Sequence, residues 1–541
     1  MRALQNSITG MRVALIAPPY PLEEAPSPPL GLCYIAAACI ASGAEVAIFD
    51  YIVSRYTPEK LRKALDSFKP DVVGTTAVTM NFRTAAGIMR EAKQHNSSLI
   101  TMIGGPHTTF DFQNTLNEYP EIDLVIMGEG EQTIAELLPI ITNGQAWSKI
   151  KGISFRKDGE VVTTEPRQLI ENLDELPLPA RHLLPISRYQ ALGYPVSIIT
   201  SRGCPNQCIF CLGRRMVGYK VRYRSTAKVV DEIEHLLLYG IDRINIADDI
   251  FTANKERVRE LCGEIKNRSL TFGWSAFSRV NTVDQETLIT MREVGCDSIS
   301  FGIESGNPEM LNRVKKGITL DQARNAIRYC KEAGISPHAS FMVGLPGENQ
   351  QTLKDSRKFG EELDIPHGYH LLAPFPGTTI RENIDQYDLE ILTENWDLYD
   401  ANRAIVRTAA LSATEMDNFV TAFDQVGDKD WQEIKERVRQ GQGTPYESLR
   451  VEGDYRMRLI FKLLTEDLIS EIGTFPRDGS SLADELAQRI TVATGMEPDF
   501  VNKTVNSLID AGYLDFDTFD GHVSWFWTHN NHVTKQSIIE G

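Results

Sequence analysis

Three cysteines within eight residues, Cys204, Cys208 and Cys211, have the spacing C-x3-C-x2-C. They directly follow a predicted strand, and thiolates so spaced on a glycine-containing loop can converge on one soft metal centre. A structural zinc site normally has four protein ligands, and no nearby Cys or His supplies the fourth. A [4Fe–4S] cluster is also usually held by four cysteines, so three would leave one iron open to a non-protein ligand. The spacing favours such a cluster, and a zinc site that borrows a distant ligand is the alternative.

The other five cysteines are scattered through apolar helical or strand patterns, where we expect them to pack as small hydrophobic side chains; they are Cys33, Cys39, Cys262, Cys296 and Cys330. Eight cysteines in 541 residues do not form a disulfide scaffold. The N-terminus lacks the long apolar core of an export signal, and the apolar stretch 31–49 is interrupted by Gly43 and Glu45. The sequence therefore predicts a cytoplasmic protein without a membrane span.

The composition is that of a folded, acidic protein, with 42% hydrophobic and 24% charged residues. Lys and Arg number 56 and Asp and Glu 73, which gives a formal charge of −17. Because an acidic surface repels phosphate backbones, we do not expect nucleic acid as a partner. At about 150 residues per domain, the length predicts three or four domains.

Strands and helices alternate along residues 1–150, which we expect to form one domain. The predicted strands cover 12–19, 44–49, 71–79, 99–103 and 122–127, and the helices cover 30–42, 58–68, 83–95 and 131–141. Repeated units of this length predict a parallel sheet with helices on both faces. Ligands of such sheets bind outside the carboxyl ends of the strands.

The loops at these strand ends carry glycines and polar residues that suit a ligand site. Glycine lets the backbone approach a ligand closely, and helix N-termini offer free N–H groups. No G-x-G-x-x-G or G-x-x-x-x-G-K-[ST] motif lies here, so neither a dinucleotide nor a P-loop nucleotide site is indicated. Turn chemistry alone would explain any single loop, but four on one rim favour a ligand site. The candidate residues are Pro18, Pro19, Gly31, Thr79, Met80, Gly104, Gly105, His107, Thr108, Gly128, Glu129 and Gly130.

A linker and a second set of strand–helix units follow. Residues 151–195 are expected to link the domains, with a hairpin turn at Asp158-Gly159. Residues 196–385 predict a partial parallel (β/α)6 barrel with polar residues at its carboxyl-terminal rim. Its predicted strands cover 196–200, 243–247, 272–277, 298–303, 338–343 and 368–372.

The last expected domain, residues 386–541, is mainly helical and strongly charged. Helices at 481–490 and 499–511, followed by a hairpin around Asp520-Gly521, resemble a winged-helix module. Residues 481–541 hold three basic and nine acidic side chains, so duplex DNA is not the expected partner. A cap over a substrate cavity or a docking surface for a protein fits better. The aromatic side chains of residues 525–527 suit either a hairpin core or that contact surface.

The cysteine spacing, with aromatic Phe210 before the last cysteine, closely resembles the radical SAM superfamily, as do the segments 301–306 and 341–347. The resemblance implies that the three cysteines hold a [4Fe–4S] cluster whose open iron binds the amino and carboxylate groups of S-adenosylmethionine (SAM). Electron transfer from the cluster, supplied by a reductant such as flavodoxin or ferredoxin, would then form a 5′-deoxyadenosyl radical. The residues expected to contact SAM are Phe210, Ser278, Arg279, Glu304, Ser305, Gly344 and Pro346.

The rim side chains make physical sense for this cofactor. Glu304 can accept from ribose hydroxyls or an ammonium group, and Arg279 can pair with the methionine carboxylate. The glycines of 344–347 would let adenine lie against the backbone. A rim carboxylate such as Asp248 or Asp249 is as often a helix cap as a ligand.

Three segments of the first domain, Pro28-Pro-Leu-Gly-Leu32, Gly104-Gly-Pro-His-Thr108 and Met127-Gly-Glu-Gly-Glu131, resemble the cobalamin-binding domain of the cobalamin-dependent radical SAM family. The resemblance implies a flavodoxin-like fold that holds the corrin at the strand ends, with residues 79–82 beneath the cobalt. The D-x-H-x-x-G motif, which supplies a histidine to cobalt in other cobalamin enzymes, is absent. We therefore expect His107 to contact the loop or the nucleotide tail, and the cobalt to lack a histidine ligand.

Over residues 12–385 the chain resembles class B, cobalamin-dependent radical SAM enzymes, most of which are methyltransferases acting on unactivated carbon. In that reaction one SAM methylates cob(I)alamin, another yields the radical that abstracts a hydrogen atom, and the substrate radical takes the methyl group from methylcobalamin. A cyclase or ring-rearranging enzyme shares this architecture and is one alternative. A methylthiotransferase is a second alternative, but such enzymes carry extra cluster cysteines in the first domain. A non-enzymatic cobalamin-sensing protein is a third, and the three-cysteine loop argues against it because such a protein would not need one.

Substrates of such relatives include antibiotic precursors, lipids and protein side chains. The acidic C-terminal module favours a protein side chain such as glutamine. The glutamine of methyl-coenzyme M reductase that a methanogen enzyme of this kind C-methylates is one candidate target.

Overall fold

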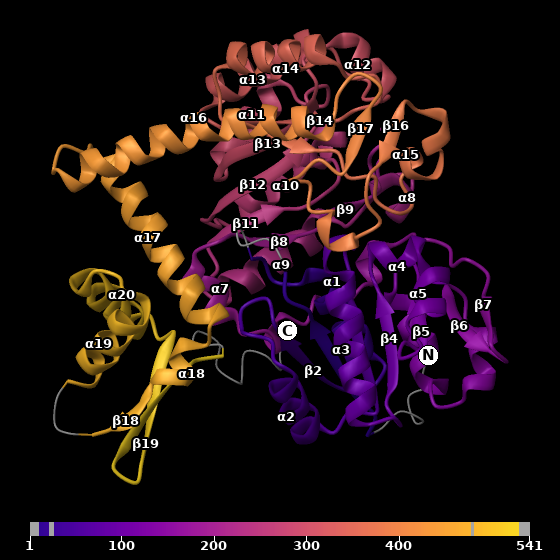
Figure 1. Cartoon of the computed structure of the whole chain (residues 1–541), viewed down its shortest axis with the longest axis vertical. Helices are drawn as coiled ribbons and strands as arrows, with labels where there is room; N and C mark the ends of the chain where they lie inside the picture. Colours follow the sequence, from indigo (N-terminus) through magenta and orange to yellow (C-terminus); the bar gives the residue numbers. More distant parts are fainter. Residues whose placement is uncertain (1–9, 21–25, 478–480, 530–541) are drawn as a thin grey trace.

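The computed structural model describes residues 10–20, 26–477 and 481–529. Figure 1 shows an N-terminal α/β unit, a strand–helix barrel beside it, and a long helical arm that carries a small module away from the barrel. Among the described residues, none of the helices has the length and apolar character that crossing a membrane requires.

A seven-stranded sheet forms the N-terminal unit, in the order β2-β1-β3-β4-β5-β6-β7. The strands are β1 (Arg12–Ala17), β2 (Glu45–Asp50), β3 (Val72–Thr76), β4 (Ile100–Gly104), β5 (Leu124–Ile126), β6 (Ile153–Lys157) and β7 (Glu160–Thr163). The first five are parallel in the expected flavodoxin-like order. The hairpin predicted at Asp158-Gly159 is β6–β7, which pairs antiparallel along β5. Because it covers an edge that would otherwise be unpaired, the sheet continues past residue 150, where the sequence placed the end of the domain.

Helices cover both faces of this sheet because successive strand residues point to opposite sides. Val13 and Leu15 lie in a core shared with α1 and α6, whereas Ala14 and Ile16 face α2, α3 and α5. The helices are α1 (Leu30–Ala41), α2 (Pro58–Phe68), α3 (Phe82–His95), α4 (Pro106–Phe110), α5 (Phe112–Glu118) and α6 (Glu131–Leu137). The α1–α6 core runs on into the barrel without a break, so the two units pack as one body.

Six parallel strands form the barrel, as the sequence predicts, and their order is β15-β14-β13-β12-β11-β8. The strands are β8 (Val196–Ile198), β11 (Arg243–Ile246), β12 (Gly273–Ser278), β13 (Cys296–Glu304), β14 (Ser336–Val343) and β15 (His367–Leu371). The outer helices are α9 (Thr226–Leu238), α10 (Lys255–Asn267), α11 (Gln285–Glu293), α12 (Pro308–Arg313), α13 (Leu320–Ala333) and α14 (Gln350–Leu363). Capping side chains such as Ser225, Asp284 and Thr319 accept from backbone N–H groups in the first turn and so fix where these helices begin.

Shorter elements join these parts: α7 (Ile186–Leu192), β9 (Ser201–Arg202), α8 (Gly213–Val217), β10 (Arg222–Tyr223), α15 (Thr379–Glu382), β16 (Leu389–Ile391) and β17 (Val406–Thr408). β16 and β17 pair antiparallel, and Val406 packs against the end of β14 at Gly344. The helical region therefore begins at Ala413 rather than near residue 386, because the intervening chain first covers the barrel.

The arm consists of α16 (Ala413–Arg439) and α17 (Pro445–Thr465). Beyond it, α18 (Leu468–Ile472), β18 (Thr474–Pro476), α19 (Leu482–Thr494), α20 (Pro498–Asp510), β19 (Leu514–Phe519) and β20 (His522–Trp527) form the helix–helix–hairpin module that the sequence predicts. Its core contains buried Trp525 and the apolar faces of α19 and α20, whereas Phe526 is exposed.

Candidate functional site

Two cavities lie where the carboxyl ends of the two sets of parallel strands face each other. The first, here the interdomain cavity, has an empty volume of about 1260 Å³ and lies between the ends of β1, β3, β4 and β5 and the barrel loops after β8 and β11. The second, here the cluster cavity, has an empty volume of about 1080 Å³ and opens at the rim of the barrel. Of the described residues, Asp249 alone lines both cavities.

The lining of the interdomain cavity combines apolar and charged side chains. Leu15, Met102 and Ile103 are among the apolar lining residues, and Glu129 and Arg202 are among the charged ones. Of the residues predicted for the first domain, those that line this cavity are Gly31, Gly104, Gly105, Gly128, Glu129 and Gly130. Those that lie outside its lining are Pro18, Pro19, Thr79, Met80, His107 and Thr108.

Gly105 is required by the sheet itself. Its φ is +103°, and a Cβ there would lie 2.6 Å from Ala77 O and 2.7 Å from Thr76 Oγ1. The sequence predicts that this glycine admits a ligand, and it does line the cavity, but the closest approach is to the backbone after β3.

His107 packs inside the protein. Its ring lies 4.2 Å from the Phe82 ring and 5.2 Å from the Trp396 ring, and Nδ1 is 3.3 Å from Thr79 Oγ1. Burial lowers the pKa of His107 to about 3, so the imidazole is neutral at physiological pH. Its position explains why it does not line the cavity. Trp396 belongs to the chain after the barrel, and no local pattern connects it with His107.

The cluster cavity collects the three cysteines and most of the predicted SAM contacts. Its predicted lining residues are Cys204, Cys208, Cys211, Phe210, Ser278, Arg279 and Glu304. Three other predicted residues lie outside it. Ser305 is buried and its Oγ lies 3.1 Å from Ser356 Oγ, Gly344 packs against Val406, and Pro346 is buried in the same turn.

Each cysteine sulfur has an N–H donor beside it. Asn206 Nδ2 lies 3.3 Å from Cys204 Sγ, Arg279 Nη1 lies 3.6 Å from Cys208 Sγ, and Gly213 N lies 3.4 Å from Cys211 Sγ. Such donors stabilise thiolates, so the donor set fits an iron–sulfur cluster. In the described part of the chain, no three His, Cys, Asp or Glu side chains are drawn together closely enough to hold a metal ion as they stand.

The cysteine loop depends on one glycine. Gly203 has φ +113°, and a Cβ there would lie 2.3 Å from Lys220 O. The loop can therefore pass against the chain that returns through β10 only if residue 203 has no side chain.

A buried ion pair closes the cluster cavity beside Arg279. Lys316 Nζ lies 2.7 Å from Glu304 Oε1, and both side chains are at most 10% exposed. Arg279 also donates to Lys316 O. Glu304 has φ +74° at a register shift between β13 and β14, a strained conformation that side chains rarely adopt. Lys316 is a residue of this site that the sequence did not predict, and its one local signal is the lysine pair after α12.

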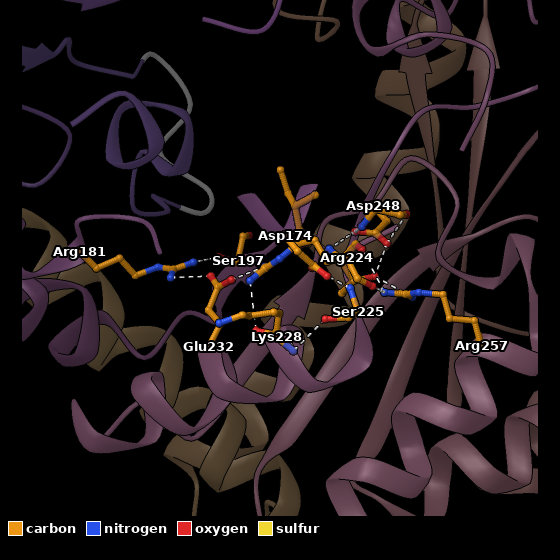
Figure 2. A network of polar contacts seen from close by, with 12 residues as sticks. Asp174, Arg181, Ser197, Arg224, Ser225, Lys228, Glu232, Asp248 and Arg257 are labelled. Atoms are coloured by element: carbon orange, nitrogen blue, oxygen red, sulfur yellow. Dashed lines mark hydrogen bonds and ion pairs between the residues drawn. The ribbon is translucent and has the colours of Figure 1, made fainter. Parts of the chain in front are cut away.

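Figure 2 shows a polar network that holds the strand leading into the cysteine loop. Arg181 donates to Ser197 O at 2.9 Å and pairs with Glu232 at 2.6 Å, and Arg224 pairs with Glu232 and donates to Ile199 O at 2.9 Å. Burial alone would raise the pKa of Glu232, but Arg181 and Arg224 hold it below its ordinary value. The charge of this fully buried carboxylate is therefore compensated.

Asp248 completes this network and is not free to bind a ligand. Its carboxylate accepts from the backbone N–H groups of Thr200 and Ser201 at 2.6 and 3.1 Å and from both of their hydroxyls at 2.6 Å. Arg257 donates to Thr200 O at 3.0 Å from the other side. Asp248 thus fixes the backbone before the cysteines, whereas the neighbouring Asp249 faces the cavities.

A second set of ion pairs joins the cysteine loop to the N-terminal unit. Arg202 lies 2.6 Å from Glu131 and 3.2 Å from Glu129, and Arg222 lies 2.8 Å from Glu129. Burial lowers the pKa of Arg202, but Glu131 and Glu129 more than offset this and raise it. Glu129, predicted to contact cobalamin, therefore lines the cavity with its charge already paired.

The residues of both cavities fit the groups that the sequence suggests. Three thiols with N–H donors suit a cluster, and Arg279 beside the Glu304–Lys316 pair offers both charges to a zwitterionic ligand. A lining of apolar side chains and glycine backbone with a few charged groups suits a large flat ring with polar edges.

Two family models match the chain. The B12 binding domain matches residues 24–138, and the radical SAM superfamily matches residues 198–360. An uncharacterized methyltransferase of Pyrococcus horikoshii is 37% identical over 399 residues, covering 72% of this chain and 86% of the relative. The anaerobic magnesium-protoporphyrin IX monomethyl ester cyclase of Rubrivivax gelatinosus is 31% identical over 400 residues, covering 70% of this chain and 72% of the relative.

Two solved structures share the fold. OxsB, a cobalamin-dependent S-adenosylmethionine radical enzyme with aqua-cobalamin and S-adenosylmethionine bound, has a TM-score of 0.67 at 18% identity over 92% of this chain and 84% of its own. TsrM, a radical S-adenosylmethionine methyltransferase from Kitasatospora setae with cobalamin and a [4Fe–4S] cluster bound, has a TM-score of 0.61 at 21% identity over 76% of this chain and 85% of its own.

Proposed function

Because this chain belongs to the cobalamin-dependent radical SAM methyltransferases, we propose that it moves a methyl group from cobalamin to an unactivated carbon after a 5′-deoxyadenosyl radical has abstracted a hydrogen atom. The observation that supports this reaction is that Asp249 lines both the interdomain cavity and the cluster cavity, so the two lie next to each other. A substrate held there would have one cofactor on each side. Reactions that need two cofactors at one carbon depend on such positioning.

Residues of the chain have distinct parts in this proposal. When bound, the cluster and SAM supply the radical and cobalamin supplies the methyl group. Cys204, Cys208 and Cys211 are the cluster ligands, because all three line one cavity with an N–H donor at each sulfur. Arg279 would hold the methionine carboxylate, and Glu304 would accept from the ribose or the ammonium group, oriented by its ion pair.

The loops of the N-terminal unit would hold cobalamin in the interdomain cavity. Gly31, Gly104 and Gly128 bring backbone to its lining, and Leu15, Met102 and Ile103 would give a ring an apolar surface to lie against. A reductant is required because radical SAM enzymes take their electron from an external donor. The proposed substrate is a protein side chain such as glutamine, which the acidic C-terminal module would help to recruit.

Comparative mass spectrometry tests the proposed reaction. Proteins and metabolites from a strain that lacks the gene would be compared with those of the same strain carrying the wild-type chain or the variant Cys204→Ala/Cys208→Ala/Cys211→Ala. A product heavier by one CH2 that appears only with the wild-type chain supports methyl transfer. Its presence with the triple variant would contradict the assignment of the cysteines.

A cyclase is the second candidate, favoured by the 31% identity to the Rubrivivax gelatinosus cyclase over 70% of this chain. The same spectra separate the two, because ring closure without methyl transfer gives a product that lacks the additional CH2. A methylthiotransferase is disfavoured, because the cysteines of the N-terminal unit, Cys33 and Cys39, are both buried in α1.

A further inference from the structure

Strand β19 forms one edge of the sheet in the C-terminal module. The sheet order is β18-β20-β19, so β19 pairs only with β20 among the described strands. The connecting turn is Asp520-Gly521, with φ of 45° and 73°, which is the two-residue turn that matches the twist of a hairpin. Figure 1 shows the hairpin at the end of the module that points away from the barrel.

The turn decides which backbone groups of β19 face outward. Phe519 and His522 flank it and form a hydrogen-bonded pair, and such pairs alternate with non-bonded pairs along an antiparallel ladder. The N–H and C=O groups of Thr518 and Phe516 therefore point away from β20. Asp515 Oδ1 accepts from the Phe516 N–H at 2.8 Å, a contact that an incoming strand would replace.

Side chains along this edge are acidic and aromatic. As every second residue of the strand, Asp515, Asp517 and Phe519 lie on the face opposite the module core, and all three are exposed. Phe519 is 52% exposed, and Phe526, which pairs with Asp515 across the ladder, is 39% exposed. No Lys or Arg of the described chain forms an ion pair with Asp515, Asp517 or Asp520. Within the described part of the chain, this strand edge thus has no neighbouring strand, and its carboxylates lie without a cation beside exposed aromatic side chains.

The carboxylates of Asp515 and Asp517 indicate which kind of strand could pair with β19. Two copies of β19 placed edge to edge would bring like charges together, which destabilises strand pairing, so the aspartates guard against self-association. The same carboxylates would pair with Lys or Arg at alternate positions of an added strand. Phe519, next on the same face, would meet an apolar residue.

We propose that β19 takes up, by strand addition, an extended basic segment of a protein partner in which Lys or Arg alternate and an apolar residue follows. Main-chain hydrogen bonds supply the affinity of such a mode, and alternate side chains supply its specificity. The identity of this partner rests on the proposed function, because we take it to be the protein whose side chain the enzyme methylates. Docking on a module at the end of the arm would raise the concentration of the target side chain near the cavities.

Peptide binding to the full-length chain tests the proposal. The probe is a fluorescein-labelled peptide with the core Lys-Thr-Lys-Thr-Leu, compared by fluorescence anisotropy with a peptide in which Glu replaces each Lys. We expect binding of the basic peptide alone, weakening as salt rises. The variant Asp515→Asn/Asp517→Asn should bind about tenfold less tightly. Glu471→Gln/Asp510→Asn, which changes the same charge on exposed residues of α18 and α20, is the matched control and should bind as the wild type does.

Two measurements separate strand addition from simple charge attraction. Thr518→Pro removes an outward N–H without removing a ladder bond to β20, and it should weaken binding to a similar extent. The basic peptide N-methylated at alternate residues loses its donors but keeps its charge, and it should fail to bind even if Thr518→Pro does not fold. Equal binding of the acidic or the N-methylated peptide would overturn the proposal. So would sedimentation of the wild-type chain as a dimer that Thr518→Pro weakens, because β19 would then already be paired with a second copy.

The outcome is independent of methyl transfer. The assay needs neither SAM nor cobalamin, and Cys204→Ala/Cys208→Ala/Cys211→Ala should bind the basic peptide unchanged. If the peptide binds but no methyl transfer is found, the docking proposal stands and the proposed function fails. If methyl transfer is found but the peptide does not bind, the docking proposal fails and the proposed function stands.

Discussion

Replacing Arg202 with methionine should loosen the joint between the two cofactor-binding units without altering a cysteine. The guanidinium lies 2.6 Å from Glu131 Oε1 and 3.2 Å from Glu129 Oε1, and all three side chains are at most 10% exposed. Methionine keeps much of the length of the side chain but leaves Glu131 without a cation. Glu129 retains Arg222 at 2.8 Å, so one buried carboxylate is stranded rather than two.

The geometry sets the expected cost. Breaking a buried ion pair from one side costs about 3–5 kcal/mol, because the remaining charge is uncompensated. We expect about 3 kcal/mol, the lower end, because Glu131 lines the interdomain cavity and can reach water there. Loss of the contact between the Arg202 guanidinium and the Tyr34 ring, 5.3 Å from its centroid, adds about 0.5–1 kcal/mol. The double variant Arg202→Met/Glu131→Gln removes the stranded charge and should recover most of the loss.

Urea unfolding and a cobalamin titration followed by absorbance measure the two consequences. Arg202→Met should unfold at lower urea and bind cobalamin more weakly, and the double variant should regain stability. Arg215→Met is the matched control, because its ion pair with Glu382 is more than a third exposed and should cost less than about 1 kcal/mol. A cost as small as the control's for Arg202→Met, or no recovery in the double variant, would refute the reasoning.

Three further predictions concern the cavities and a buried carboxyl group. Replacing Cys204, Cys208 and Cys211 together with alanine should abolish iron–sulfur absorbance and deoxyadenosine formation, and retained iron would contradict the ligand assignment. Gly31→Phe should place its ring in the interdomain cavity, because a Cβ at residue 31 meets nothing within 4 Å, and should lose bound cobalamin but keep iron, whereas Gly31→Ala keeps both. Burial raises the pKa of Glu348 from 4.5 to about 8. Between pH 4.5 and pH 8 the folded chain therefore keeps a proton on Glu348 that the unfolded chain releases. The free energy of unfolding should fall across this range by up to about 1.4 kcal/mol per pH unit. Glu348→Gln can still accept from the Gly344 and Leu345 N–H groups but carries no titrating proton. In urea unfolding, its stability relative to the wild type should therefore rise from pH 5 to pH 8. The same pH dependence of stability in both proteins would contradict the prediction.

Local patterns in the sequence determined the elements and the kind of chemistry. The alternation of strands and helices predicted both parallel sheets. Strands of a parallel sheet are buried on both faces, so they appear in the sequence as short apolar runs whichever strands they pair with. The spacing of Cys204, Cys208 and Cys211 predicted one soft-metal site, because three residues on one short loop are close in space wherever the loop lies. The hairpin at Asp520-Gly521 was likewise predicted from its own residues, because a two-residue turn is set by its own φ angles.

Only the tertiary structure decided which side chains meet at the cavities. Lys316 reaches Glu304, Glu131 reaches Arg202 and Trp396 covers His107 across separations that no local pattern encodes. The two adjacent aspartates show the limit most clearly. Asp248 and Asp249 are indistinguishable in sequence, yet one is saturated by four donors from Thr200 and Ser201 and the other faces both cavities. Their roles differ because the packing of β8 against β11 brings hydrogen-bond donors to one carboxylate and open space to the next.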